Sequence, residues 1–173
     1  MNTERRTTRL RLLLLASLLA CPAAGARDCV EPCAGTLGEL LSSLDADQAE
    51  EMRHPGSSDA RTDWTYVPWG HHGLALRDMT EQQRGWAEAL VRSALSPSGI
   101  ATYKGVLELE QELYENTWFK PFRDPGKYYL ALFGDPGAKP WSWRFGGHHL
   151  SINVTHGAEG SFATPFFTGA NPA

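Results

Sequence analysis

The apolar residues of this 173-residue chain change their spacing near residue 120, and that change constrains the fold more than any other feature. Before it, apolar side chains recur at helical spacing. After it, they form short runs bounded by turn residues, which is typical of strands. Helices followed by an antiparallel sheet predict an α+β fold. We expect helices over about 37–53, 81–95 and 97–116, and strands over about 127–133, 141–155 and 161–167.

Capping signals mark the expected helix starts. Thr36 to Glu39 and Thr80 to Gln83 have the form of a capping box, in which the first and fourth residues satisfy each other's backbone N–H groups. Asp45 to Gln48 repeats the signal and predicts a short break within the first helical region. Ser96-Pro97 is a typical start for the third helix.

The first 26 residues have the three parts of a secretory signal peptide. Four arginines precede an apolar run from Leu12 to Ala20, and Ala24-Gly25-Ala26 offers a cleavage site. The run is too short for a bilayer, which takes about 20 residues, so we expect no transmembrane span. The sequence predicts an exported protein, periplasmic or secreted, with a single α+β domain over residues 37–173.

The three cysteines leave two questions open. Leu18 to Cys21 resembles a bacterial lipobox, which would make Cys21 a lipidated first residue and anchor the protein. Cys29 and Cys33 form a C-x3-C pair, for which a disulfide is the expectation in an oxidising compartment. A metal site is the alternative for that pair, although zinc sites usually contain a second one.

Charge argues against one class of partner. The chain has a net charge of −4, and the arginines near its start make the remainder more negative still. A protein that binds the phosphate backbone needs the opposite sign, so we expect no nucleic acid. A small-molecule ligand or substrate is the expected partner.

Apolar residues change parity across Gly146-Gly147. They are odd-numbered from Trp141 to Phe145 and even-numbered from Leu150 to Val154. A β-bulge shifts the register of a strand by one residue, and glycine tolerates the backbone that it needs. We therefore predict one strand from Trp141 to Thr155 with a bulge at the two glycines.

The candidate site lies around this break. On a regular strand His148 shares the apolar face, whereas His149 shares the polar row with Asn153. His148 is then either a core histidine or a residue that points into a pocket beside the bulge. The two histidines cannot both bind one metal from a regular strand. Arg144 is the candidate group for holding an anion, while His156 is expected in a solvated turn.

Several longer strings carry a family resemblance. They are W-T-Y-V-P (64–68), R-D-P-G-K-Y-Y-L-A-L-F-G-D-P (123–136), W-S-W-R-F-G-G-H-H-L-S-I-N (141–153) and T-P-F-F-T-G-A-N-P-A (164–173). From about Leu37 to its end, the chain resembles the N-terminal half of domain-of-unknown-function family 3500. The resemblance implies a site around Arg144, His148, His149 and Asn153, and it implies no particular reaction. Full-length members are about twice as long, so a second polypeptide that supplies the other half is an expected kind of partner.

Three functional hypotheses remain, because the sequence contains no nucleophile elbow, phosphate loop or zinc-protease motif. The first is a metal-assisted enzyme, an oxidoreductase or hydrolase, in which His148 or His149 binds a divalent transition metal or moves a proton and Arg144 holds an anionic group. The second is a binding module, in which the aromatic cluster Trp141, Trp143 and Phe145 and the polar row beside it take up a small ligand without chemistry. The third is a truncated, inactive product.

Overall fold

The computed structural model describes residues 32–118 and 120–170. The expected signal peptide 1–26, the lipidation alternative at Cys21 and the Cys29 partner of the expected disulfide lie outside these residues. No helix within the described ranges combines the length and the apolar character that a membrane span requires.

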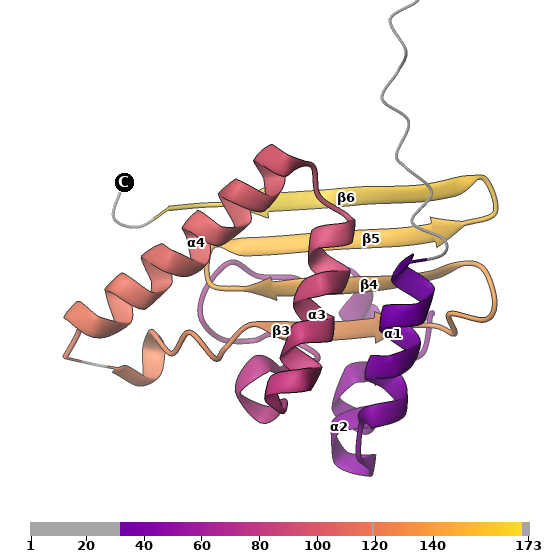
Figure 1. Cartoon of the computed structure of the whole chain (residues 1–173), viewed down its shortest axis with the longest axis horizontal. Coiled ribbons are helices and arrows are strands. Elements are labelled where there is room, and N and C mark those ends of the chain that lie inside the picture. Colours follow the sequence, from indigo (N-terminus) through magenta and orange to yellow (C-terminus); the bar gives the residue numbers. More distant parts are fainter. Residues whose placement is uncertain (1–31, 119, 171–173) are drawn as a thin grey trace, which may run out of the picture.

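Four helices precede the long strands, as the α+β prediction requires (Figure 1). They are α1 (Pro32–Ser43), α2 (Ala46–Met52), α3 (Glu81–Ser93) and α4 (Pro97–Asn116). Three 3-10 turns join them to the rest: η1 (Asp59–Arg61), η2 (Leu76–Asp78) and η3 (Lys120–Phe122).

The capping predictions are confirmed at two of the predicted boxes. Asp45 and Thr80 each exchange both hydrogen bonds of a capping box with the residue three positions on. The box at Asp45 splits the expected helix over 37–53 into α1 and α2. The start expected from Thr36 is wrong, because α1 begins at Pro32 and Thr36 lies inside it.

The sheet has six strands in the order β1-β3-β4-β5-β6, and β2 pairs with the same edge of β3 as β1 does. All neighbours are antiparallel except β1 and β3. The strands are β1 (Arg53–His54), β2 (Leu74–Ala75), β3 (Tyr129–Phe133), β4 (Trp141–Gly147), β5 (Leu150–Gly157) and β6 (Gly160–Thr168).

The main core lies between the helices and one face of the sheet. Figure 1 shows α1, α3 and α4 in front of the strands. From the sheet, this core receives the side chains of Trp143 and Phe145 on β4 and of Ile152 and Val154 on β5. All four are at most 5% exposed, so this face of the sheet is closed to solvent.

The single strand expected over residues 141–155 is instead a hairpin. β4 and β5 are joined by a two-residue turn, His148-His149, and Gly147 pairs with Leu150. In such a hairpin an odd-numbered residue always faces an even-numbered one, as Phe145 faces Ile152. Chain reversal therefore explains the change of parity, and the predicted bulge at Gly146-Gly147 is wrong. A register shift does occur, but between Ile152 and Val154, where β5 pairs with β6.

Gly147 has a different role from the one expected. A Cβ atom added there would lie 2.6 Å from Cδ1 of Tyr128 and 2.8 Å from the carbonyl oxygen of Lys127. Contacts this short do not occur between real side chains, so glycine permits the close approach of β4 to Tyr128. The Tyr128 hydroxyl then donates a hydrogen bond to the carbonyl oxygen of His148, at 2.9 Å, and fixes the turn.

Candidate functional site

The face of the sheet opposite the helices carries polar side chains. Cross-strand pairing places Arg144 of β4 opposite Asn153 of β5, and Ser142 opposite Thr155. The segment over residues 55–73 packs against this face: Trp64 and Tyr66 contact the ring of Phe167 on β6, and His71 stacks on Tyr129 of β3. Sheet and segment together enclose polar groups away from the main core.

Arg144 is the most unusual of these groups. It is only 5% exposed, and its guanidinium lies 5.5 Å from the centre of the Phe133 ring. Its Nη1 atom is buried and has no hydrogen-bond partner within the described residues. Burial lowers the pKa of Arg144, while the more distant Asp63 acts in the opposite direction. A buried guanidinium normally has an anion beside it, because its desolvation is costly.

His54 approaches the same aromatic ring. Its imidazole stacks on Phe133 with ring centres 5.3 Å apart, and its Nε2 atom is also buried without a partner in the described part of the chain. Burial lowers the pKa of His54, and the charges of His72 and Arg144 lower it further. Two unsatisfied nitrogen atoms thus flank Phe133.

A cavity of about 240 Å³ opens on this face next to neighbours of Arg144, although Arg144 and His54 are not themselves among its lining residues. Phe133 contributes to its wall, and Asn153 lies beside Arg144 on the adjacent strand. The residues that line it come from the 55–73 segment and from four strands: Arg61, Thr62, Trp64, Phe133, Ser142, Trp143, Asn153, Thr155, Thr164 and Pro165.

Two further histidines lie on the segment over 55–73. The Nε2 atom of His72 is 3.1 Å from the carboxylate of Asp63, and the two side chains are 38% and 73% exposed. The Nε2 atom of His71 donates to the carbonyl oxygen of Val67 at 2.7 Å. Burial lowers the pKa of His71, and the hydrogen bond to Val67 partly opposes that shift. Both histidine rings therefore have a polar partner.

A second polar cluster lies at the end of the β4–β5 hairpin, on the side of the helices. Glu110 of α4 is 3% exposed, and its Oε2 atom lies 2.5 Å from Nδ1 of His148, which is 7% exposed. Nη1 of Arg123 lies 3.2 Å from Nδ1 and 3.1 Å from Nε2 of the same ring. Since Glu110 occupies Nδ1, we assign the bond from Arg123 to Nε2. His148 thus connects a carboxylate at one ring nitrogen to a guanidinium at the other.

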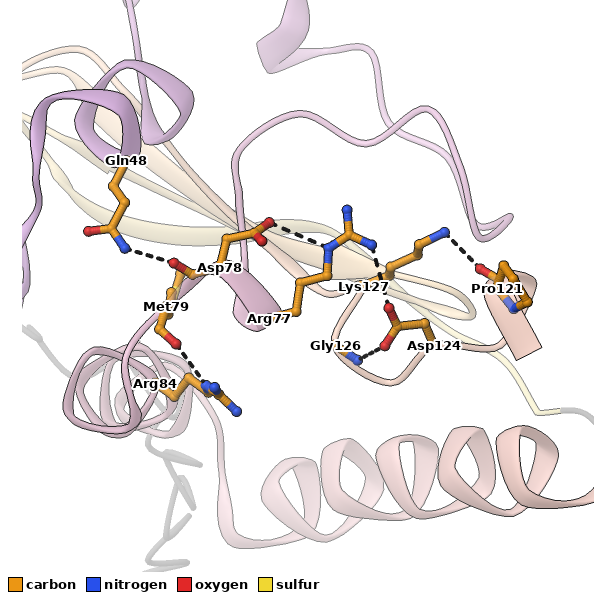
Figure 2. Close-up of polar contacts among 9 residues, drawn as sticks. All are labelled: Gln48, Arg77, Asp78, Met79, Arg84, Pro121, Asp124, Gly126 and Lys127. Atoms are coloured by element: carbon orange, nitrogen blue, oxygen red, sulfur yellow. Dashed lines mark hydrogen bonds and ion pairs between the residues drawn. The ribbon is translucent and has the colours of Figure 1, made fainter.

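Figure 2 shows polar contacts within and around the segment over 120–127, the segment to which Arg123 belongs. Arg77 contacts the carboxylate of Asp124 at 3.5 Å, and the other carboxylate oxygen accepts from the backbone N–H of Gly126 at 2.8 Å. Lys127 donates to the carbonyl oxygen of Pro121 at 2.7 Å. These contacts involve Pro121 and Asp124, which lie on either side of Arg123 in the sequence.

His149 is the second residue of the hairpin turn and has a φ of +59°. Its backbone N–H donates to the carbonyl oxygen of Tyr66, and its own carbonyl oxygen accepts from Gly169. Its ring stacks on that of His148 with centres 3.8 Å apart. Burial lowers the pKa of His149, and the nearby His148 adds to the shift. His149 therefore ties the turn to the 55–73 segment and to the end of β6.

A family model described as "Protein of unknown function (DUF3500)" matches residues 28–173. The chain belongs to the DUF3500 family. No curated protein and no solved structure matches it.

The structure of this DUF3500 member divides the four expected site residues between two places. Arg144 and Asn153 are neighbours on the face opposite the helices. His148 and His149 form the turn, with His148 bonded to a helix. The expectation that these histidines point to opposite faces of a strand is wrong, because turn residues do not alternate as strand residues do.

Three residues of these clusters, Glu110, Arg123 and His54, were not predicted as site residues from the sequence. Glu110 follows Val106 by four residues and Tyr103 by seven, so it lies on the buried stripe of α4, where an acidic residue is unusual. His54 lies at the end of the short strand β1, and no pattern marked it. His156, expected in a solvated turn, is instead buried on β5 and stacks on Trp141.

The metal hypothesis is not tested by these contacts. Among the described residues, no three or more His, Cys, Asp or Glu side chains gather in a way that could hold a metal ion. Metal binding by His148 or His149 stays a prediction for this DUF3500 member.

Proposed function

We propose that the protein binds a small anionic molecule in the cavity between the sheet and the 55–73 segment, with Arg144 as the principal cation. The observation that carries this proposal is the buried Nη1 atom of Arg144, which has no partner in the described part of the chain, while two neighbours of Arg144, Phe133 and Asn153, line the cavity. Leaving such a group unsatisfied is destabilising, and proteins retain such costs mainly at binding and catalytic sites.

His54 supports the same proposal. Its Nε2 atom is a second buried nitrogen beside Phe133 that has no partner among the residues that the structure describes. A carboxylate or phosphate has several acceptor oxygens, so one anion can accept hydrogen bonds from both Arg144 and a protonated His54. The size of the cavity favours a small ligand, since pockets for drug-sized molecules are typically about 300–1,000 Å³.

Isothermal titration calorimetry tests the proposal. We expect the full chain to bind acetate or inorganic phosphate with saturable heat, and Arg144→Gln to lose at least tenfold in affinity. Arg92→Gln is the matched control, because Arg92 is an exposed residue of α3 that pairs with Glu88. Equal affinity in the wild-type chain and Arg144→Gln would refute the role of Arg144.

A second candidate function is an enzyme in which His148 moves a proton or binds a divalent transition metal. The contact between Glu110 and Nδ1 of His148 favours it, because a carboxylate on one ring nitrogen orients a histidine. The other nitrogen, Nε2, then acts as a base or a metal ligand once it gives up its contact with Arg123. Metal analysis of purified protein is the test. We expect close to one metal per chain, which His148→Ala abolishes and His156→Ala retains.

We also propose that residues 1–26 direct export, to the periplasm or the medium. The arginines, the short apolar run and the small residues before Arg27 support this. Sequencing the N-terminus of the exported protein is the test: a start at Arg27 is expected, a start at Met1 contradicts it, and a lipidated Cys21 favours a membrane anchor.

A further inference from the structure

Neutral polar side chains form half of the lining of the cavity. Three of them, Ser142, Thr155 and Thr164, have hydroxyls that make no side-chain hydrogen bond within residues 32–118 and 120–170. The set consists of four hydroxyl residues and one amide: Thr62, Ser142, Asn153, Thr155 and Thr164. Hydroxyl groups both donate and accept, so this lining suits a ligand with several hydroxyls of its own.

Trp64 adds an apolar surface to the polar lining. Its ring is 37% exposed and is supported from one side by Phe167, at 5.7 Å between ring centres. The face of an indole carries partial negative charge and attracts polarised C–H groups. A flat ligand with C–H bonds on one face and hydroxyls at its edge fits both surfaces.

We infer that the anion is a sugar acid, that is, a monosaccharide carboxylate such as a uronate. This inference rests on the proposed anion site at Arg144. Its carboxylate pairs with Arg144, its hydroxyls bond to the threonine, serine and asparagine side chains, and its C–H face packs on Trp64. Two other ligand classes fit less well. A neutral sugar leaves Arg144 without an anion, and an aliphatic carboxylate leaves the hydroxyls desolvated without partners.

Calorimetry on the full chain compares three kinds of probe. The first is a set of uronates (D-glucuronate, D-galacturonate and D-mannuronate), the second is D-glucose, and the third is acetate. We expect at least one uronate to bind tenfold or more tightly than both acetate and glucose.

Two variants test whether the preference for a uronate depends on residues that line the cavity. Thr155→Val removes a hydroxyl at nearly constant shape, and Trp64→Ala removes the stacking surface. Each should weaken uronate binding about tenfold, and should weaken acetate binding by a smaller factor. Trp118→Ala is the control, because Trp118 is 92% exposed and does not line the cavity.

The results distinguish failure of the sugar-acid inference from failure of the proposed anion site at Arg144. If acetate binds through Arg144 but no uronate binds more tightly, the sugar-acid inference is wrong and anion binding stands. If no probe binds, or if Arg144→Gln binds every probe as well as the wild-type chain does, both are wrong. Uronate binding that survives Thr155→Val and Trp64→Ala also overturns the inference, because the ligand then lies elsewhere.

Discussion

Glu110 and His148 are 38 residues apart in sequence and meet at 2.5 Å between α4 and the tip of the β4–β5 hairpin. Both side chains are almost fully buried. The contact links α4 to the hairpin turn, and Arg123 contacts the other ring nitrogen of His148. A buried carboxylate of this kind is tolerated only with such partners.

Removing the charge of Glu110 should therefore destabilise the fold. We expect Glu110→Gln to lower the free energy of unfolding by about 1–3 kcal/mol, the usual effect of breaking a buried hydrogen bond to a charged group. Denaturant unfolding measures this. Glu108→Gln, on the exposed side of the same helix, is the control and should change stability by less than about 0.5 kcal/mol. Equal effects of the two substitutions would mean that the contact contributes little.

The chain reversal at His148-His149 could not be predicted from the pattern of apolar residues. A bulge and a two-residue hairpin both shift apolar residues from odd to even positions, so parity alone cannot distinguish them. The usual signal for a hairpin is glycine or asparagine within the turn. Here the glycines precede the turn, and a histidine adopts the positive φ.

The candidate site could also be predicted only in part from the sequence. Arg144 and Asn153 were both singled out from the sequence, and the hairpin makes them neighbours. The contact of Glu110 with His148 depends on how α4 crosses the sheet, which no local pattern encodes. The acidic residue on the buried stripe of α4 was the signal that could have indicated it.

A substitution at Gly147 tests whether this glycine is needed for the close approach of β4 to Tyr128. We expect Gly147→Ala to destabilise the protein by about 2 kcal/mol or more, because its Cβ atom would overlap the Tyr128 ring. Thermal unfolding measures the loss. Gly85→Ala is the contrast: it lies in α3 with nothing within 4 Å of the added atom, and should stabilise by about 0.5–1 kcal/mol. A neutral Gly147→Ala would contradict the close approach.

Arg144 should reduce stability when no ligand is bound. Replacing it with methionine removes a buried charge that has no hydrogen-bond partner at Nη1 within residues 32–118 and 120–170, and keeps much of the apolar stem. We expect Arg144→Met to raise the free energy of unfolding by about 1–3 kcal/mol and to abolish stabilisation by an anion. Thermal melts with and without acetate test both effects. A less stable Arg144→Met would indicate that the guanidinium is satisfied in the folded protein.

The pH dependence of stability follows from the histidine shifts. The pKa values of His54, His71, His149 and His156 are all lowered, in each case mainly by burial. Since the unfolded chain then takes up protons at a higher pH than the folded one, folding stability is fully present above about pH 6.5 and falls as the pH drops through the lowered values. Acid-induced unfolding monitored by circular dichroism should show this loss.

Anion affinity should change with pH in the opposite sense to stability. Without ligand, the positive charge of Arg144 helps to keep His54 neutral. An anion beside Arg144 reverses that effect and favours protonated His54, so binding takes up protons and tightens as pH falls from about 7.5 to about 5.5. Calorimetry in buffers of different ionisation enthalpy measures the proton uptake. We expect His54→Gln to lose it and His156→Gln, whose ring lies against Trp141, to retain it. Identical pH profiles for the wild-type chain and His54→Gln would exclude His54 from the anion site.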